Sequence, residues 1–444
     1  MTDRLTDDSR AGSGGALTPS PPATVPSTRS PSCRPATAGE RLARRLLFRA
    51  LSHLEHGQIL LTEGETVHVF GRASEILPLR ATVRVHDPAC YPTMLLGGNV
   101  GAGRAYIEGL WSADDLVTLV RIVAANQETL ARVDGGLSWL TKPLDLIYHA
   151  VRRNSRRGAR RNIAAHYDLG NDFFAQFLDE TMMYSSAWFE RDDDDLARAS
   201  RAKLRRLCDK LALTPADHVL EIGTGWGGFA EHAARHHGCR VTTTTISEAQ
   251  YRHARARIQA SGLADRVTVL NRDYRELTGT YDKLVSIEMI EAVGAEHFDN
   301  YFEACSRLLA PHGLMALQAI VIPDQRYDQA RRAVDFIKRF VFPGGCLPSV
   351  GAIATSIGRS SDLSIVQLED LTPDYALTLR HWRERFLAAR ARVRELGFDD
   401  AFIRLWEYYL AYCEGGFRER VIGDVQILLA RSRWRGRVPL PRGG

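Results

Sequence analysis

Hydrophobic and polar positions alternate between helical and strand periods along much of the chain. Residues 196–211 have helical spacing, residues 218–223 form an apolar strand-like run, and this alternation continues to residue 322. Such alternation with short connections is typical of βαβ units, which build a parallel sheet covered by helices on both faces. We therefore predict a doubly wound α/β domain, to which residues 361–370 and 423–432 add two further strands.

The chain before residue 142 has a pattern of its own. Leucines recur at helical spacing over residues 41–54 with arginines between them, and strand-like runs follow at 66–73 and 81–87. A second helical run covers residues 114–126. We interpret residues 38–141 as a small N-terminal α/β domain.

Two segments have the composition of a tail and a linker. Residues 1–37 are rich in Ser, Thr, Pro and Gly, and we predict a disordered tail because so few apolar residues cannot offset the entropy of ordering. Residues 152–161 contain six arginines, within a basic linker predicted over 142–165. This strip is either a solvated linker or a cationic surface for anionic phospholipid, at about 1 kcal/mol per Arg. A nucleic-acid contact is a weaker interpretation, because no aromatic residues are interleaved. The catalytic domain then covers residues 166–444.

Composition narrows the class of protein. Of 444 residues, 45% are hydrophobic and 25% charged, as in ordinary globular proteins. We find no apolar run near the roughly 18 residues of a membrane-spanning helix and no secretory signal, so we expect neither an integral membrane protein nor an exported one. The seven cysteines are scattered without a CxxC pair. They argue against disulfides and a metal site, and for a reducing cytoplasm.

A glycine-rich turn between a predicted strand and helix marks the candidate ligand site. Glu221 precedes three glycines at 223, 225 and 228 that match the GxGxxG pattern of dinucleotide-binding proteins. A nicotinamide enzyme needs an acid after its second strand, but residues 241–246 end without one. Because Asp273 instead follows the third strand, S-adenosylmethionine (AdoMet) suits the pattern better than NAD. A purely structural turn is the remaining interpretation.

Several motifs, in order, resemble the cyclopropane-fatty-acyl-phospholipid synthase family. The resemblance runs from about residue 40 to the end of the chain and is carried by residues 162–190, 219–230, 286–294, 342–349 and 406–417. It implies a class I AdoMet-dependent methyltransferase domain of Rossmann-like fold, with AdoMet as methyl donor. The segment ending in FPGGCLPS is similar to plant-type cyclopropane synthases and to tuberculostearic acid methyltransferases.

The resemblance also implies the residues of the site. Those expected to bind AdoMet are Tyr184, Ser185, Gly223, Gly225, Thr245, Ile246, Gln250, Asp273 and Tyr274. The family binds bicarbonate beside the reacting methyl group, and the matching catalytic positions are Ser186 (through its backbone), Glu291, Gln318, Ile320 and Tyr375, with Cys413 at a family cysteine. Many bacterial members have Cys at position 186 and His at position 318, but a Gln amide can still donate to carbonate.

The chemistry of an isolated alkene sets what the site must do. The double bond must be held in line with the methyl group, and methyl transfer leaves a carbocation on the acyl chain. Aromatic faces can stabilise that cation, and we consider Tyr184, Trp188, Phe189, Tyr375 and Phe417, with core packing as the alternative role. Bicarbonate is the expected base, and the proton that it removes decides between a cyclopropane and a methyl or methylene branch.

We therefore predict an AdoMet-dependent C-methyltransferase that transfers a methylene carbon to the cis double bond of an unsaturated phospholipid acyl chain. The alternatives are a tuberculostearic-type methyltransferase that forms a 10-methyl or 10-methylene chain and a non-catalytic lipid-binding protein of the same fold. Small-molecule and nucleic-acid methyltransferases are disfavoured. The expected partners are acyl chains in the bilayer and an anionic membrane surface, with no nucleic acid and with a homodimer left open. We expect a cytoplasmic protein bound peripherally to the inner face of the membrane.

Overall fold

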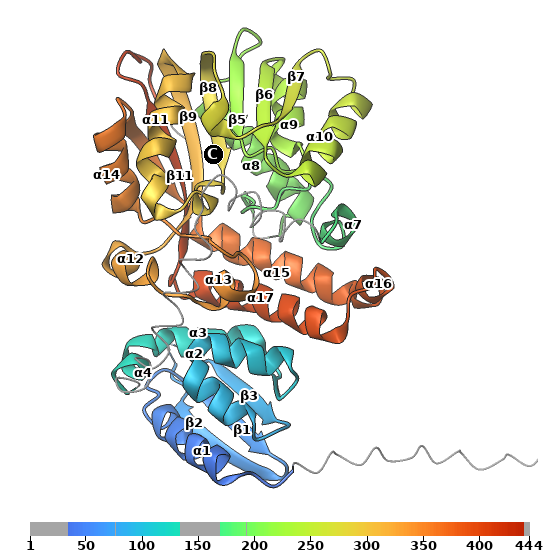
Figure 1. Ribbon diagram of the computed structural model, residues 1–444, viewed down its shortest axis with the longest axis vertical. Coiled ribbons are helices and arrows are strands. Elements are labelled where there is room, and N and C mark those ends of the chain that lie inside the picture. The colour runs from blue at the N-terminus through green and yellow to red at the C-terminus, as the bar shows by residue number, and fades with distance from the viewer. Residues whose placement is uncertain (1–33, 76, 134–168, 192, 439–444) are drawn as a thin grey trace, which may run out of the picture. The chain divides into compact units, whose positions relative to one another are not determined.

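Two separate β-sheets organise the chain (Figure 1). A four-stranded sheet has the order β2-β1-β3-β4, and a seven-stranded sheet has the order β10-β11-β9-β8-β5-β6-β7. The computed structural model describes residues 34–75, 77–133, 169–191 and 193–438.

The small sheet is formed by strands β1 to β4 and is accompanied by four helices. The strands are β1 (Gly57–Glu63), β2 (Thr66–Arg72), β3 (Arg80–Val85) and β4 (Trp111–Ala113), and the helices are α1 (Ala38–Leu51), α2 (Cys90–Ile107), α3 (Leu116–Ala125) and α4 (Gln127–Val133). The sequence analysis expected the strands over 66–73 and 81–87 and the helices over 41–54 and 114–126, and it missed β1, β4 and α2.

Helix α2 was not predicted from the sequence because it contains several glycines. Gly98 has a φ of 52° and kinks the helix. A Cβ on Gly101 would lie 2.0 Å from the Thr93 carbonyl oxygen, so only glycine allows this close approach. Glycines are usually evidence against a helix, although here they permit the kink and the packing.

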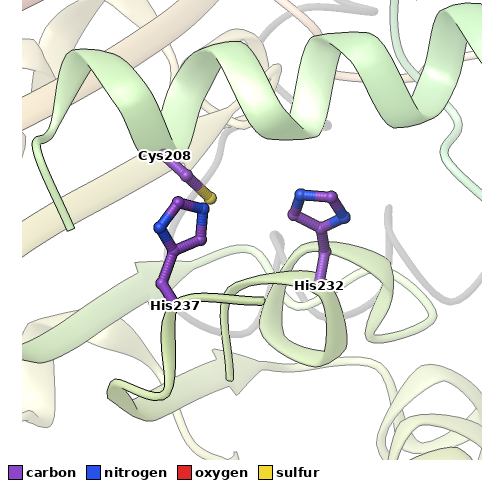
Figure 2. Close-up of side chains that lie close together, drawn as sticks. All are labelled: Cys208, His232 and His237. Atoms are coloured by element: carbon purple, nitrogen blue, oxygen red, sulfur yellow. The ribbon is translucent and has the colours of Figure 1, made fainter. Parts of the chain in front are cut away.

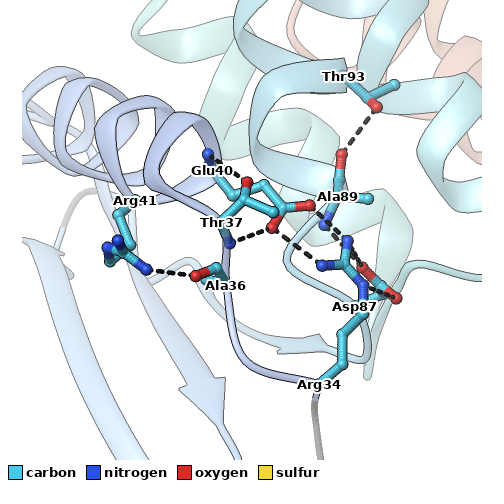
Figure 3. Close-up of polar contacts among 8 residues, drawn as sticks. All are labelled: Arg34, Ala36, Thr37, Glu40, Arg41, Asp87, Ala89 and Thr93. Atoms are coloured by element: carbon cyan, nitrogen blue, oxygen red, sulfur yellow. Dashed lines mark hydrogen bonds and ion pairs between the residues drawn. The ribbon is translucent and has the colours of Figure 1, made fainter.

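Helix α1 begins with a capping box that also fixes the chain before it (Figure 3). The Thr37 hydroxyl accepts from the Glu40 backbone N–H at 3.3 Å, and the Glu40 carboxylate accepts from the Thr37 N–H at 2.7 Å. The Arg34 guanidinium donates to both Glu40 and Asp87, at 3.1 Å each. Residues 34–37, which the sequence analysis assigned to the tail, are thereby bonded to the first helix. The rest of that tail lies outside the described residues.

The seven-stranded sheet has the doubly wound order that the sequence predicted. Its parallel strands are β5 (His218–Ile222), β6 (Arg240–Thr245), β7 (Val267–Asn271), β8 (Tyr281–Ile287) and β9 (Leu309–Val321). The chain winds outward from β5 to β7 and then crosses back to β8 on the other side of β5. The ends of β5 and β8 therefore form the switch point where such sheets bind ligands.

The last two strands run against the others. Strand β11 (Gly423–Ala430) pairs antiparallel with both β9 and β10 (Ser364–Asp370) and lies between them. Both strands were predicted, but the sequence analysis did not give their direction. The helices between β10 and β11 are α15 (Thr372–Ala388), α16 (Arg390–Glu395) and α17 (Asp400–Arg418).

Helices cover both faces of the large sheet (Figure 1). Helices α8 (Leu196–Lys210), α9 (Gly228–His237) and α10 (Glu248–Ala260) share one apolar cluster with the strands. Helices α11 (Phe298–Leu308) and α14 (Val350–Ser360) share another. The shorter helices are α7 (Asn171–Phe174), α12 (Asp324–Ala330) and α13 (Phe336–Phe340). The predicted doubly wound α/β architecture is confirmed.

Strand β9 begins directly after a helix. Helix α11 ends at Leu308, and β9 begins at Leu309 and includes Pro311. A Cβ on Gly313 would lie 2.6 Å from the Leu309 side chain, so this strand start is closely packed.

Some predictions fall outside the described residues. The basic linker over 142–165, its arginine strip and both domain boundaries beside it lie there, so these assignments stay predictions. Across the parts of the chain that are described, every helix is too short or too polar to cross a bilayer.

Candidate active site

A cavity opens at the carboxyl ends of the parallel strands. Its lining includes Ile222 at the end of β5, Thr245 at the end of β6, Ile287 at the end of β8 and Ile320 near the end of β9. This is the edge at which open α/β sheets place their ligands. The cavity is the candidate site.

The glycine turn after β5 forms one side of this cavity. Gly223 and Gly225 have φ values of 103° and 52°, a region that residues with a Cβ rarely adopt. A Cβ on Gly228 would lie 2.5 Å from the carbonyl oxygen of Thr181, so α9 begins in direct contact with the segment that leads into the site. The turn therefore presents bare backbone to the cavity.

All residues predicted to bind AdoMet line this one cavity. They are Tyr184, Ser185, Gly223, Gly225, Thr245, Ile246, Gln250, Asp273 and Tyr274. The Thr245 hydroxyl donates to the Gln250 amide oxygen at 2.9 Å. The Asp273 carboxylate accepts from the Arg275 guanidinium at 2.9 and 2.6 Å, which fixes its orientation. The structure brings these residues together, and their individual contacts with AdoMet stay predictions.

Glu221 supplies a polar group suited to AdoMet. Its carboxyl lies before the glycine turn, lines the cavity and is 2% exposed. Among the described residues its Oε2 has no hydrogen-bond partner, and burial raises the pKa of the carboxyl to about 8. A buried acceptor without a donor is costly unless a ligand supplies the donor. The amino group of AdoMet is such a donor, so the residues present fit this group.

A second carboxylate, Glu288, connects the predicted catalytic residues. Its Oε1 accepts from the Ser186 backbone N–H at 2.8 Å and from the Gln318 amide nitrogen at 2.8 Å. Its Oε2 accepts from the Tyr375 hydroxyl at 2.7 Å. Three predicted catalytic residues thus meet at a side chain that the sequence analysis did not select.

The backbone at Glu288 is strained. The residue follows β8 directly and has a φ of 46°, in the left-handed region that costs about 1–2 kcal/mol for a residue with a side chain. Its N–H donates to the Gln318 carbonyl oxygen at 2.8 Å. Strained residues of this kind concentrate at functional sites, where the surrounding structure holds them. The turn directs Glu288 into the cavity lining.

Gln318 lies on β9 behind Glu288 and is fully buried. Its amide nitrogen donates to Glu288 and, at 3.1 Å, to Asp424 on β11, while its amide oxygen accepts from Gln426 at 3.1 Å. The amide nitrogen and the amide oxygen of Gln318 therefore both have hydrogen-bond partners within the protein. Ser186 is equally buried, and neither residue lines the cavity.

Glu291 lies three residues after Glu288 and lines the same cavity. Its Oε1 accepts from the Ile320 backbone N–H at 2.5 Å, and its Oε2 has no partner among the described residues. Burial, followed by repulsion from Glu288, raises the pKa of Glu291 to about 8. The carboxyl therefore keeps its proton at neutral pH.

The residues predicted to hold bicarbonate do not fit the ion as they are placed. Ser186, Gln318 and Tyr375 all donate to Glu288, and the Ile320 N–H donates to Glu291. An ion in the cavity would have to displace Glu288 to reach Gln318 or the Ser186 N–H. The predicted residues lie close together, but a carboxylate of the chain, that of Glu288, accepts from three of them.

The sequence analysis also missed two buried residues behind this network, one lysine and one aspartate. Lys203 on α8 is fully buried, its ammonium donates to the Ser185 hydroxyl at 2.7 Å, and burial lowers its pKa to about 8. Asp424 is fully buried, and burial raises its carboxyl pKa well above the usual range. Lys203 stands on the apolar stripe of its helix with Leu196 and Leu207, which is a signal that the sequence did contain.

The aromatic candidates divide into two groups. Tyr184, Tyr375 and Phe417 line the cavity, and the rings of the latter two stack at 4.3 Å. Trp188 instead lies under the Arg206 guanidinium at 3.9 Å, and Phe189 stacks on His381. Neither of these two lines the cavity, so their assignment as cation stabilisers is not supported.

Cys413 lines the cavity from α17 and has intermediate exposure. Burial raises the pKa of its thiol, so the group stays protonated and acts as apolar lining. Its predicted catalytic role stays a prediction.

A separate cluster could hold a metal ion (Figure 2). Cys208 on α8 and His232 and His237 on α9 place one ligand atom each within 4.8 Å of one another. Thiolate and neutral imidazole are ligands that zinc prefers. Burial raises the pKa of Cys208 well above its usual value and lowers that of His232 to about 4, so a metal would have to displace the thiol proton. None of the three lines the cavity.

Comparison with known proteins agrees with this architecture. The family model for mycolic acid cyclopropane synthetase matches residues 154–427. Tuberculostearic acid methyltransferase UfaA1 of Mycobacterium tuberculosis is 40% identical over 405 residues, which cover 89% of this chain and 92% of that protein. The cyclopropane-fatty-acyl-phospholipid synthase of Escherichia coli K12 is 37% identical over 357 residues, covering 79% of this chain and 88% of that protein.

Solved structures give the same result for the large sheet and its helices. The mycolic acid cyclopropane synthase CmaA1, complexed with SAH and CTAB, has 31% identity and a TM-score of 0.58 over 61% of this chain and 98% of that chain. The cyclopropane synthase MmaA2 from Mycobacterium tuberculosis has 28% identity and a TM-score of 0.57 over the same shares.

Proposed function

The chain belongs to the mycolic acid cyclopropane synthetase family of AdoMet-dependent methyltransferases, and from this premise we propose that it is a cyclopropane-fatty-acyl-phospholipid synthase. Its substrates would be AdoMet and the cis double bond of an unsaturated phospholipid acyl chain. The observation that carries the proposal is one cavity in which the glycine turn, several buried carboxyl groups and aromatic side chains meet. The identity to the Escherichia coli synthase supports this choice of reaction.

Each part of the cavity has a role in this proposal. AdoMet supplies an electrophilic methyl group on a sulfonium centre. The turn at Gly223 and Gly225 and the acceptor Glu221 would hold its methionine part, and Asp273 would face its adenine. Tyr375 and Phe417 present aromatic faces that stabilise positive charge on the acyl chain, an attraction of about 0.5–2 kcal/mol per ring. Apolar walls exclude water, which would otherwise capture the cation.

Bicarbonate is left out of this proposal. The predicted ion needs the Ser186 N–H, Gln318 and Tyr375, and these donors are bonded to Glu288. Removal of the final proton therefore needs another acceptor, which is treated separately below.

A tuberculostearic-type reaction is the second candidate. The observation in its favour is the 40% identity to tuberculostearic acid methyltransferase UfaA1 over 89% of the chain. Both reactions pass through the same carbocation and differ in the step after it. Loss of a proton from the new methyl group closes the ring, whereas a hydride shift followed by proton loss gives a methylene branch.

We further propose that the protein works in the cytoplasm on the inner face of the membrane. The small sheet carries Val67 and Val69, 53% and 58% exposed, on the same face as the exposed Arg80 and Arg84. Exposed apolar side chains beside cations suit an anionic bilayer surface. The arginine strip at 152–161 has the same chemistry.

Product analysis tests the proposed reaction. The purified protein is incubated with AdoMet and vesicles of oleoyl phospholipid, and the acyl chains are identified by mass spectrometry and NMR. A cyclopropane ring on the acyl chain is the expected result. A methylene or methyl branch would favour the second candidate, and the absence of both a lipid product and S-adenosylhomocysteine would leave only a lipid-binding role.

Vesicle binding tests the membrane proposal. Two variants are compared with the unmodified protein, one with Arg80 and Arg84 changed to Gln and one with Arg152, Arg153, Arg156 and Arg157 changed to Gln. Each should bind anionic vesicles more weakly, by about 1 kcal/mol for each arginine removed, with no change for neutral vesicles. Unaltered co-sedimentation of both variants with anionic vesicles contradicts the proposal.

A further inference from the structure

Glu288 has the contacts expected of a group that carries negative charge during the reaction. Three donors converge on its carboxylate, namely the Ser186 N–H, the Gln318 amide and the Tyr375 hydroxyl, at 2.7–2.8 Å. Charge-assisted hydrogen bonds of this kind stabilise the ionised form. Lys203 adds a buried positive charge that acts in the same direction.

The position of Glu288 allows it to reach the substrate. It lines the cavity together with Tyr375, whereas Ser186 and Gln318 lie behind it. Its left-handed backbone turns the side chain toward these donors directly after a central strand of the sheet. The donors and the cavity therefore lie on two sides of the same carboxylate.

Gln318 is matched to this arrangement. An amide nitrogen carries two N–H groups, and here one donates to Glu288 and the other to Asp424. A histidine in the same place offers a single N–H on each ring nitrogen. The amide of Gln318 can therefore hold two carboxylates at once, those of Glu288 and Asp424.

We propose that the Glu288 carboxylate is the proton acceptor of the methyl-transfer reaction and takes the place of bicarbonate. This inference rests on the proposed function and goes beyond it. The neighbouring Glu291 is a poorer acceptor because it has only one donor, the Ile320 N–H, whereas three donors stabilise negative charge on Glu288.

The step balances without a further reactant. The π electrons of the double bond form a bond to the methyl carbon, and the carbon–sulfur bond breaks with its electron pair remaining on sulfur. The adjacent carbon becomes a cation. Glu288 then takes a proton from the new methyl group, and the electrons of that C–H bond form the bond that closes the ring. Glu288 ends as a carboxylic acid and loses its proton to water when the product leaves.

Two substitutions at position 288 separate this role from a structural one. Glu288→Gln keeps the size of the side chain and one oxygen that can accept from the Ser186 N–H and Gln318, but it replaces the other carboxylate oxygen with an NH2 group and removes the basic site. Glu288→Gly removes the side chain, suits the positive φ and opens space beside the donors. Glu303→Gln, an exposed position on α11, is the matched control. Calorimetric titration with AdoMet verifies that each variant retains the cofactor site.

Rates of S-adenosylhomocysteine and lipid product formation are measured in carbon-dioxide-free buffer and with added bicarbonate. The unmodified protein and Glu303→Gln should respond to bicarbonate by less than about twofold. Both Glu288 variants should lose about 10²–10⁴-fold in rate, as for loss of a general base. Added bicarbonate should restore at least about tenfold in Glu288→Gly, where the ion can enter, and nothing in Glu288→Gln.

The outcomes distinguish this inference from the function on which it rests. A full rate in Glu288→Gln, or an unmodified enzyme that needs bicarbonate for turnover, overturns the role of Glu288 while leaving the proposed reaction intact. An unmodified protein that forms no product under any condition overturns both. The bicarbonate dependence of the unmodified protein decides the question even if neither variant folds.

Discussion

Removal of the Tyr375 hydroxyl tests the network around Glu288 with little change to the fold. The hydroxyl donates to Glu288 Oε2 at 2.7 Å, while the ring is 6% exposed and stacks on Phe417 at 4.3 Å. In Tyr375→Phe the ring and its packing remain, and only the donor is lost. The Glu288 carboxylate then keeps its other two donors and loses the third.

The size of the effect follows from the charge of the acceptor. A hydrogen bond to an ionised group contributes about 1.5–3 kcal/mol, which corresponds to about 10- to 100-fold in rate if the charge is needed in the reaction. The hydroxyl also lowers the pKa of Glu288, which burial raises above its usual value. Its removal should therefore raise that pKa further and shift the acidic limb of the rate profile to higher pH.

The assay is the initial rate of S-adenosylhomocysteine release with oleoyl phospholipid vesicles, measured across pH. Tyr251→Phe, which removes a hydroxyl outside the cavity, is the matched control. AdoMet affinity should be unchanged in both variants. If Tyr375→Phe retains kcat within about twofold and the same pH profile, the hydroxyl does not support a charged base and the reasoning is refuted.

Two further substitutions test other parts of the structure. Gly228→Ala should lower the free energy of unfolding by about 1–3 kcal/mol, because the added Cβ lies 2.5 Å from the Thr181 carbonyl oxygen. Calorimetry measures this loss of stability. Gly358→Ala is the control and should not destabilise the protein, because Gly358 has open space around it. An equal melting temperature for Gly228→Ala contradicts the close contact. Lys203→Met removes a buried charge that lowers the pKa of Glu288, so activity should need a higher pH than in the unmodified enzyme. A pH profile of kcat/KM that does not move would show that Lys203 has no influence on the reacting group.

Local patterns predicted the large sheet well because its strands are short, apolar and separated by capped helices. They could not give strand direction. Residues 423–430 have the same apolar character in either orientation, and only the path through α15 to α17 makes β11 antiparallel. The same patterns missed α2, because its glycines serve a kink and a close contact that depend on tertiary packing.

The site was predicted unevenly for a related reason. The glycine turn and the residues matched to AdoMet were found because each belongs to a local motif at a strand end, and all line one cavity. Glu288 was present in the same quoted motif as Glu291 but was not selected, since its importance arises from donors on three distant segments. Neither Asp424 nor Lys203 belongs to a motif, and their relation to Glu288 is visible only in the structure, although the position of Lys203 on the apolar stripe of α8 was a signal in the sequence.

The position of β11 has a consequence for the synthesis of the protein. This strand joins β10 to the rest of the sheet and brings Asp424 and Gln426 against Gln318. A nascent chain that has not yet emerged past residue 430 lacks the strand that bonds Gln318 behind Glu288, and β10 lacks the strand with which it pairs. The glycine turn can form early, but the groups behind Glu288 are complete only when translation of this strand is finished. Activity should therefore be absent from any chain that stops before this strand is complete.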